Sequence, residues 1–311
     1  MHQKTPENGD NSRAKAIDAE TQFEAHRGLM FSIAYRMLGS AMEAEDIVQD
    51  AYLRYQAVPL QDIQSHRALL STIVTRLCLN RLDLARTRRE LYTGFWLPEP
   101  ILTDSDNPRR LPEGNLRVND SISLALLTLL ESLTPVERAV FILHEVFDYS
   151  YGEIAEIVEK EETACRQLLS RAKKHIAEKR PRFKSSPQAH KQILDSFMQA
   201  SLAGELDGLL KVLADDVVLW ADGGGQIRGA ATQPIYGADA VARFVLFSLN
   251  YLPENYRVEQ AEVNGEMAIM LWTDKQLFLV ISVDEDLDRI RDLRIIASPQ
   301  KLAYIQSKAA G

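Results

Sequence analysis

The sequence has few of the residues that build disulfide frameworks, metal centres or catalytic sites. Its 311 residues include two cysteines, Cys78 and Cys165, which lie in separate helical patterns. Neither a disulfide framework nor a zinc site is indicated, and a reducing compartment fits best. The six histidines show no paired spacing, and no Walker loop or Gly-x-Ser-x-Gly turn occurs. We therefore expect no metal, no cofactor and no catalytic residue, and so no enzyme.

Long apolar runs are also lacking. No stretch of about 18 apolar residues occurs, and the polar first 20 residues lack the apolar segment of a signal peptide. We therefore expect a cytoplasmic protein with no membrane contact. With 46% hydrophobic and 26% charged residues, the chain is long enough for two or three globular domains.

The net charge of −8 hides two local excesses of basic residues. The C-terminal part beyond residue 184 carries 11 basic and 17 acidic residues, whereas the part before it is nearly balanced, with 25 and 27. Between residues 67 and 90 six basic residues face two acidic ones, and between residues 160 and 184 nine face three. Because phosphates respond to charges within a Debye length of about 8 to 10 Å, such patches suit nucleic acid even on an acidic protein.

Periodicity and capping signals predict two separate helical modules. Apolar residues at helical spacing predict a bundle over residues 20–90, with a break at Gly39-Ser40. Residues 91–118 contain four prolines, which is typical of a linker. In the second module, residues 119–182, Thr134 with Glu137 and Ser150 with Glu153 form two capping boxes. A basic helix is predicted to follow, from about residue 163 to residue 180.

The short helix, tight turn and basic helix have the layout of a helix-turn-helix, whose second helix enters the DNA major groove. Its first exposed face carries Arg166, Gln167 and Ser170, and Arg171, Lys173 and Lys174 follow as phosphate or further base contacts. Leu168, Leu169, Ala172 and Ile176 are expected to pack inward. A solvated basic helix is the alternative, but the two capping boxes and the short turn favour DNA.

The first module carries two further polar faces. Arg76, Asn80, Asp83 and Arg88 lie on adjacent turns of a helix whose apolar side is Leu77, Leu79 and Leu84. Such a face suits melted or single-stranded nucleic acid, although ordinary surface charge explains it equally well. The preceding helix gathers Glu43, Glu45, Asp46 and Asp50 around Ile47 and Tyr52. No basic or metal-binding residue accompanies these acids, which favours a protein docking surface over a catalytic dyad.

The last third, residues 188–303, is predicted to be an α+β domain. Two helices, at about 188–203 and 205–214, precede strand-like runs, and Asn264-Gly265 is a strong hairpin signal. The remaining strands are expected to continue an antiparallel meander. The glycine-rich stretch Asp222-Gly223-Gly224-Gly225-Gln226 lacks the Lys-Ser/Thr of a nucleotide loop. It is better explained as a tight bend that another backbone segment approaches.

The linker begins with Phe95-Trp96-Leu97-Pro98-Glu99-Pro100, whose prolines exclude a helix interior or a central strand. Its large apolar side chains need a surface to dock on. We expect Trp96, Leu97, Pro98 and Glu99 to lie against the C-terminal domain, near Asp222, Gly223, Gly224 and Gly225. Burying Trp96 and Leu97 would contribute about 1.5 to 3 kcal/mol each.

Three stretches carry a resemblance to a known family: AYRMLGSAMEAEDIVQDAYLRY, LNRLDLARTRRELY and ACRQLLSRAKKHI. They are similar to regions two and four of bacterial RNA polymerase sigma factors of the extracytoplasmic function (ECF) class. Within that class the chain resembles the SigJ-like group with a C-terminal SnoaL-like extension. That group has a WLPEP linker motif, a DGGG(K) element and an NPDKL-like end, which read here Trp96–Pro100, Asp222–Gln226 and Ser298–Leu302.

The resemblance implies a multidomain fold: an all-α region 2 bundle, an all-α region 4 helix-turn-helix and an α+β SnoaL/NTF2-like cone-shaped barrel domain. It implies that the chain binds promoter DNA and core RNA polymerase, at the clamp coiled coil of the largest subunit. The polymerase contact would be made by the helix Ala44–Tyr55, through Glu45, Asp46, Ile47, Gln49 and Asp50. The minus-ten element would be read and opened by Arg76, Asn80, Arg81, Asp83, Arg86, Arg88 and Arg89, and the minus-thirty-five element by the basic helix. The C-terminal domain would modulate this activity in cis.

Two other functions stay open. A one-component regulator would hold a small ligand in its α+β domain and bind operators without polymerase. A SnoaL-like enzyme would use Asp222, Trp220 or Tyr236 as base and wall of a pocket. The sequence of this domain shows no His-Asp pair to support such chemistry. A linker that only follows the RNA exit path is the alternative to a docked Trp96.

Overall fold

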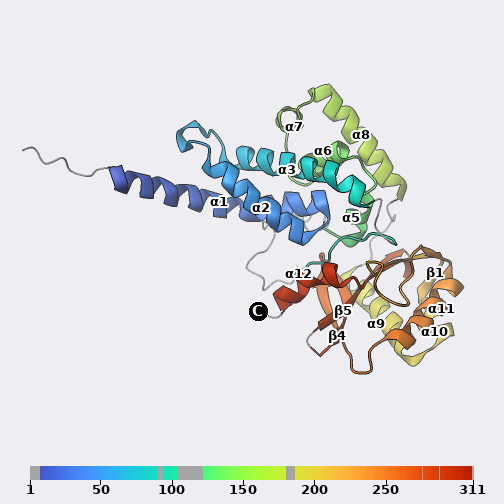
Figure 1. Ribbon diagram of the computed structural model, residues 1–311. Helices are drawn as coiled ribbons and strands as arrows, with labels where there is room; N and C mark the ends of the chain where they lie inside the picture. Colours follow the sequence, from blue (N-terminus) through green and yellow to red (C-terminus); the bar gives the residue numbers. More distant parts are fainter. Residues whose placement is uncertain are drawn as a thin grey trace, which may run out of the picture.

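Apart from the linker segment 94–103, the N-terminal half of the described chain is mainly helical (Figure 1). The computed structural model describes residues 8–89, 94–103, 122–179, 186–274, 276–286 and 288–309, with only the backbone for residues 8–18, 85–89, 179 and 309. The helices of this half are α1 (Asn8–Leu38), α2 (Ala41–Gln56), η1 (Leu60–Asp62), α3 (His66–Arg89), α5 (Leu124–Leu130), α6 (Pro135–Glu145), α7 (Tyr151–Val158) and α8 (Glu162–Lys179).

Local capping residues set the ends of these helices. The expected break is confirmed, because Gly39 takes a positive φ of 67° and Ser40 caps α2 by accepting the Glu43 N–H. Both predicted capping boxes are present, at the starts of α6 and α7, and each satisfies two backbone donors that the helix leaves open. For α6 and α7 the local sequence therefore determines where the helix begins.

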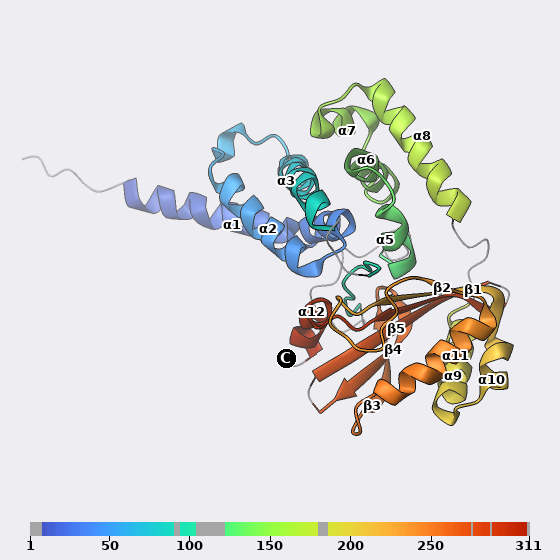
Figure 2. The same ribbon diagram turned by 45° about the vertical axis from the view of Figure 1, so that its right-hand side comes forward.

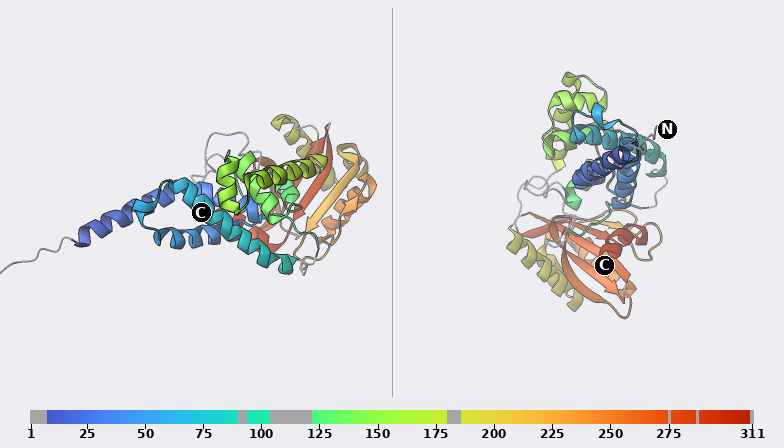
Figure 3. Two further views of the ribbon diagram at one scale, coloured as in Figure 1. Left: turned by 90° about the horizontal axis from the view of Figure 1, so that it is seen from above. Right: turned by 90° about the vertical axis from the view of Figure 1, so that its left-hand side faces the viewer.

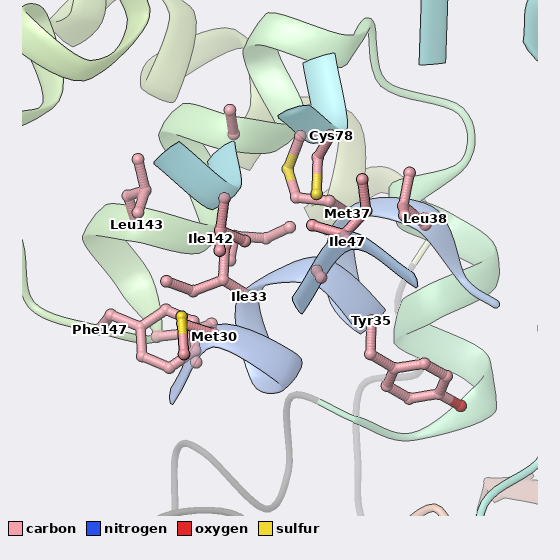
Figure 4. Close-up of a cluster of buried hydrophobic side chains, with 14 of the residues drawn as sticks. Met30, Ile33, Tyr35, Met37, Leu38, Ile47, Cys78, Ile142, Leu143 and Phe147 are labelled. Carbon is pink, nitrogen blue, oxygen red and sulfur yellow. The ribbon is translucent and has the colours of Figure 1, made fainter. Parts of the chain in front are cut away.

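The helices before and after the linker share one hydrophobic core, so the two predicted modules pack against each other. Figure 4 shows this core, in which side chains of α1, α2 and α3 meet those of α6. Ile142 and Leu143 of α6 are fully buried beside Ile33 and Met37 of α1. The reason is that the apolar stripe of α6 is covered by α1 and α3 rather than by its own module alone.

Polar contacts cross the same boundary. The Arg138 guanidinium on α6 is buried and donates to the Met37 carbonyl at 2.6 Å. The Tyr149 hydroxyl donates to Ser71 Oγ on α3 at 2.6 Å. Buried polar groups are costly unless they are hydrogen-bonded, so these bonds fix one relative orientation of the two modules.

The C-terminal domain packs helices against a six-stranded mixed sheet, and the expected α+β architecture is confirmed. Its elements are α9 (Pro187–Ala203), α10 (Leu206–Val212), β1 (Leu213–Asp222), β2 (Ile235–Tyr236), α11 (Ala238–Ser248), η2 (Leu249–Tyr251), β3 (Arg257–Val263), β4 (Glu266–Thr273), β5 (Gln276–Asp286), β6 (Arg289–Ile296) and α12 (Pro299–Ala309). The strand order is β2-β1-β6-β5-β4-β3. The predicted Asn264-Gly265 hairpin joins β3 to β4, and both residues have positive φ, of 54° and 79°.

The sheet departs from the expected antiparallel meander where β1 joins it. Strands β3 to β6 are antiparallel neighbours, but β1 runs parallel to β6. A parallel pair needs a long connection, and here the chain passes through α11 and the meander before it returns beside β1. Neither α11 nor α12 was expected from the sequence.

The two faces of the sheet have different covers. Side chains alternate between faces along a strand, so Ile269 faces α9, α10 and α11, whereas Met270 and Trp272 face the opposite side. Figure 2 shows α9, α10 and α11 grouped on one side of the sheet. The opposite face is covered by α12 and the linker, and beyond them by the helical half (Figure 3). In the described ranges no helix has the length and apolar character to span a membrane.

A buried ion pair joins α9 to the sheet. His190 Nδ1 lies 2.8 Å from a Glu285 carboxylate oxygen, and His190 Nε2 lies 2.9 Å from the Met267 carbonyl oxygen. Burial by itself lowers the pKa of His190, but the hydrogen bonds to Glu285 and Met267 and the nearby carboxylates outweigh it and raise the pKa to about 9. Both ring nitrogens face acceptors, which is the geometry of a protonated imidazole.

This pair predicts a pH-dependent stability of the C-terminal domain. Because the folded pKa exceeds the unfolded value of about 6.5, the stabilisation is complete below pH 6.5 and is lost as pH rises through about 9. We expect a loss on the order of 2 kcal/mol between these limits, measured by denaturant unfolding of the full chain at several pH values. His190→Gln should flatten this slope; an unchanged slope in the variant would assign the pH dependence to other groups.

Candidate nucleic-acid and polymerase interfaces

Helix α8 has a buried face and a basic exposed face, as the sequence predicted. Leu169, Ala172 and Ile176 are buried, and Leu168 is half-buried. The six residues expected to read DNA are all exposed: Arg166, Gln167, Ser170, Arg171, Lys173 and Lys174. The helix therefore presents a continuous row of donors to solvent while its apolar side holds it in the core.

Two of these side chains have partners within the chain. Arg166 pairs with Glu162 at 3.1 Å and lies over the Tyr151 ring at 4.3 Å, and Lys173 pairs with Glu145 at 2.8 Å. All of these side chains are at least partly exposed, and such pairs are weak, so they do not prevent binding to phosphate. Among the described residues, Gln167, Ser170 and Arg171 have no hydrogen-bond or ion-pair partner.

The turn before α8 positions this face. Glu159 ends α7 with a left-handed φ of 55°, a conformation that glycine adopts more easily. The N–H groups of Glu159 and Lys160 both donate to the Ala155 carbonyl, which closes the turn. The Glu159 carboxylate in addition lies 3.1 Å from Arg76 of α3.

The basic face of α3 is partly engaged by the second module. Arg76 donates to the carbonyls of Glu156 and Ile157 on α7, at 2.8 and 3.1 Å. Arg81 lies 3.6 Å from Asp46, while Asn80 and Asp83 are exposed. The side chains of Arg86, Arg88 and Arg89 lie outside the described residues. Leu84, expected on the apolar side, is 73% exposed, so that expectation was wrong.

Helix α2 presents an acidic face with apolar residues at its edge. Asp46, Gln49 and Asp50 are exposed, and Met42 and Leu53 on the same helix are 51% and 67% exposed. The expectation for Ile47 needs correction, because its side chain is 2% exposed in the core of α1, α2 and α3 and is not available to a partner.

Glu45, also expected to contact polymerase, is engaged inside the chain. Its carboxylate pairs with Arg27 of α1 at 2.6 Å and accepts a longer hydrogen bond, of 3.4 Å, from the Tyr304 hydroxyl of α12. One of the predicted polymerase contacts therefore touches the C-terminal domain.

The linker segment 94–103 lies between the helical half and the C-terminal domain. The Leu97 side chain is fully buried against the sheet, and its N–H donates to Asp222 Oδ2 at 2.8 Å. The Lys301 ammonium of α12 donates to both the Asp222 carboxylate and the Leu97 carbonyl, and lies 4.1 Å from the centre of the Trp96 ring. We name Trp96, Leu97, Asp222 and Lys301 the junction cluster.

The bend after Asp222 has the geometry that this contact requires. Gly224 and Gly225 have positive φ, and the Gly224 N–H donates to Asp222 Oδ1. Gly223 is buried, and a side chain there would come within 2.7 Å of Ala230. These glycines shape the bend, while Asp222 makes the bonds to the linker.

Glu99 connects the linker to the helical half, at the start of α2. Its buried carboxylate accepts hydrogen bonds from the Ser40 hydroxyl and from the N–H groups of Ala41 and Met42, at 2.7, 2.8 and 3.1 Å. Burial raises the pKa of Glu99, and these hydrogen bonds offset part of the increase. A linker residue thus caps the N-terminus of α2, where the helix dipole favours negative charge. Pro98, between the two contacts, is also buried.

A second set of bonds runs from the β3–β4 turn. The Asn264 amide donates to the Tyr35 hydroxyl of α1 at 2.7 Å and to the Ile122 carbonyl at 2.8 Å, and its oxygen accepts the Ile101 N–H at 3.0 Å. Tyr35 in turn donates to the Glu99 carbonyl at 2.6 Å. One buried side chain of the C-terminal domain therefore contacts α1, the linker and Ile122, which lies two residues before α5.

Several contact residues were not anticipated as such. Asn264 was interpreted only as a turn residue and Gly39 only as a helix break, and Tyr35 was not singled out. Gly39 lies under the Trp96 ring, and a Cβ there would come within 2.6 Å of it. Lys301 was visible as part of the terminal motif, but nothing in the sequence connected it to Asp222.

The residues proposed for an enzyme do not gather in one pocket. Asp222 is bound to Lys301 and Leu97, Trp220 donates to Asp292 at 3.2 Å and packs on Phe95, and Tyr236 is 67% exposed. This geometry gives no support to the enzyme alternative.

Comparisons with known proteins agree with these features. The family descriptions Sigma-70 region 2 and Sigma-70, region 4 match residues 22–89 and 123–176. The ECF RNA polymerase sigma factor SigJ of Mycobacterium tuberculosis is 38% identical over 250 residues, 79% of each chain. The probable ECF RNA polymerase sigma factor SigI of the same organism is 31% identical over 293 residues, covering 93% of this chain and 96% of that one.

A solved structure matches nearly the whole chain. The crystal structure of the Mycobacterium tuberculosis extracytoplasmic function sigma factor SigJ has a TM-score of 0.72 and 32% identity, over 91% of this chain and 98% of that one. The resemblance that the sequence motifs suggested is thereby confirmed. The chain belongs to the ECF RNA polymerase sigma factors.

Proposed function

We propose that this sigma factor is a non-catalytic initiation subunit that reads a two-element promoter in the cytoplasm and is restrained in cis by its C-terminal domain. As a sigma factor it binds core RNA polymerase and promoter DNA. The observation that carries the DNA-reading part is the exposed basic face of α8, held by the buried Leu169, Ala172 and Ile176. Synthesis of RNA belongs to the polymerase.

Two faces divide the promoter between them. On α8, Arg166, Gln167 and Ser170 read base edges of the minus-thirty-five element, and Arg171, Lys173 and Lys174 add phosphate contacts. On α3, Asn80, Arg81, Asp83 and Arg76 contact the minus-ten element, together with Arg86, Arg88 and Arg89. The extra exposure of Leu84 supports this role, because an apolar side chain beside donors suits unstacked bases.

The polymerase contact is assigned to α2. Its exposed Asp46, Gln49 and Asp50 lie beside Met42 and Leu53, which supports a docking surface with an apolar centre and a charged rim. We assign the clamp coiled coil of the largest subunit as the partner of this face.

The helices α3 and α8 must move apart before the two promoter elements can be read together. The names of the two elements place them about 25 base pairs apart, or about 85 Å along B-DNA. Helices α3 and α8 belong to one shared core, and Arg76 is bound to α7. Two faces of one packed unit do not span that distance, so polymerase and DNA must select a separated state.

The C-terminal domain stabilises the closed state. Asn264 bridges α1 to Ile122, and Glu99 and the junction cluster connect α2 to the sheet. Opening breaks these buried hydrogen bonds, each of which contributes about 0.5 to 1.5 kcal/mol. The domain therefore lowers the population of the open state.

A run-off transcription assay tests the core of this proposal. Purified full-length protein added to core polymerase should give promoter-specific transcripts from a library of genomic fragments. Complete absence of transcripts with both the full chain and a chain ended at residue 184 would contradict the initiation role.

Charge reversal on α2 tests the docking surface. The double variant Asp46→Lys, Asp50→Lys should weaken binding to core polymerase at least tenfold, because both carboxylates lie on the exposed face. Binding is measured by size-exclusion chromatography and fluorescence anisotropy with labelled protein. Asp207→Lys, Glu254→Lys, two exposed acids of the C-terminal domain, is the charge-matched control. Equal affinity of both double variants would place the contact elsewhere.

Substitutions on α8 test the reading of the minus-thirty-five element. Gln167→Ala should relax base preference at one position and cost about 1 to 3 kcal/mol, whereas Lys174→Ala should weaken binding to all sequences and reduce the salt dependence. Both are measured by transcription from randomised promoters. Exposed Lys191→Ala on α9 is the control. Unaltered base preference in both α8 variants would exclude this face.

Asn264→Gly tests the restraint by the C-terminal domain. Glycine keeps the positive φ of the hairpin turn but removes the bonds to Tyr35, Ile122 and Ile101. We expect a larger radius of gyration by X-ray scattering and about tenfold tighter promoter binding, since roughly 1.4 kcal/mol less restraint favours the open state. Asp274→Gly makes the same backbone change at an exposed turn of the same sheet. Identical behaviour of the two variants would remove Asn264 from the restraint.

A further inference from the structure

The C-terminal domain contains an apolar cavity between its helices and its sheet. It measures about 120 Å³ and is lined by α9, α11 and η2 on one side and by strands β3 to β6 on the other. Phe197, Phe244 and Leu271 are among the lining side chains. An engineered cavity of about 150 Å³ with a similar lining stays dry and takes up benzene, so this space suits an apolar guest of comparable size.

The polar groups of the lining are already used or lie at the rim. The Ser201 and Ser248 hydroxyls donate to the carbonyls of Phe197 and Val245, both at 2.7 Å. The interior therefore offers little to a polar ligand, because an unpaired polar atom there would lose its hydration without compensation. The lining contains one carboxylate, Asp222, which is bound by Lys301 and the Leu97 N–H and so is not available as a catalytic acid or base.

The rim carries one cation. Arg228 is the single basic residue of the lining and is exposed, beside the half-exposed Tyr251. Within the described ranges no carboxylate pairs with Arg228. Asp222, the acid of the lining, is bound instead by Lys301 and the Leu97 N–H. An apolar space with an unneutralised guanidinium at its mouth is complementary to a small apolar carboxylate.

We propose that this cavity binds a small apolar monocarboxylate, with a chain or ring of about six or seven carbon atoms inside and its carboxylate at Arg228. Inorganic anions are excluded by the apolar interior, and neutral hydrocarbons gain nothing from Arg228. The site requires no covalent step and no cofactor.

The end wall of the cavity is shared with the junction cluster. Asp222 and Ala297 line the cavity, and the Ala297 and Ser298 N–H groups donate to the Asp222 carbonyl. The carboxylate of the same Asp222 holds Leu97 and Lys301 on the other side. A guest that moves this wall moves the linker contact, so occupancy changes the stability of the closed state. This regulatory consequence rests on the proposed restraint in cis, whereas the binding site does not.

Binding is tested on the free full-length protein with octanoate as the probe and 1-octanol as its neutral counterpart. Methyl-labelled protein should show chemical-shift changes at Ile269, Leu271 and Ile295, which line the cavity. Ser248→Phe, which fills the cavity from α11, should weaken octanoate binding at least tenfold. Arg228→Gln should weaken octanoate about five- to tenfold and leave 1-octanol unchanged.

Matched variants separate the cavity from surface binding. Ser196→Phe places the same ring on the exposed side of α9, and Arg243→Gln removes an exposed arginine of α11; both should bind octanoate like the unmodified protein. No methyl shifts, or full octanoate binding in Ser248→Phe, would overturn the site. Equal loss of octanoate and 1-octanol in Arg228→Gln would overturn the carboxylate assignment.

The coupling has its own readout. Hydrogen exchange of the Leu97 amide, which donates to Asp222, should change at least threefold when octanoate saturates the free protein. Unchanged exchange with confirmed binding would overturn the coupling and leave the site intact. Because this measurement needs neither polymerase nor DNA, a failure of the transcription assay would not be mistaken for a failure of the ligand site.

Discussion

A buried segment without regular secondary structure must satisfy its backbone groups outside itself, and this requirement organises the molecule around residues 96–101. The Leu97 N–H bonds to Asp222, the Glu99 N–H to the Gly39 carbonyl and the Ile101 N–H to Asn264. The partners alternate between the C-terminal domain and the helical half. Since unpaired buried peptide groups are expensive, the segment is stable in this place only while both neighbours are present. A linker is thereby the contact that defines how the domains are arranged.

The same arrangement is the structural basis of the proposed restraint of DNA binding in cis. The shared core of α1, α3 and α6 and the bonds of Arg76 to α7 keep the two proposed DNA-reading faces in one unit. Separation exposes apolar surface at about 25 cal/mol per Å², so the free energy must come from polymerase and promoter contacts. A ligand or partner that interacts differently with the two states shifts their populations by its differential affinity and no more. The proposed restraint by the C-terminal domain would act within these limits, through a few buried hydrogen bonds.

The functional assignment depends on how charge and apolar surface are divided. The basic row on α8 could be recognised from the sequence although the net charge of the protein is negative. The apolar residues between the basic ones recur at helical spacing and are buried, which assigns the basic residues to the exposed face. On α2 the same periodicity was only partly interpreted, since Ile47 was grouped with the acids although its position faces the core. One residue of offset along a helix moves a side chain by about 100°, which decides between core and surface.

Local interactions within about four residues determined what could be predicted: the helix caps at Ser40, Thr134 and Ser150, the Asn264-Gly265 turn and the amphipathic α8. The tertiary structure alone decided that α6 packs on α1, that β1 runs parallel to β6 and that Lys301 meets Asp222. Those contacts join residues from 74 to 204 positions apart, as for Leu219 with Leu293 and for Lys301 with Leu97. The sequence contains many apolar stripes and charged side chains, and it does not show which of them contact one another. Only simultaneous packing in three dimensions selects among them, because each choice changes the surface left for the others.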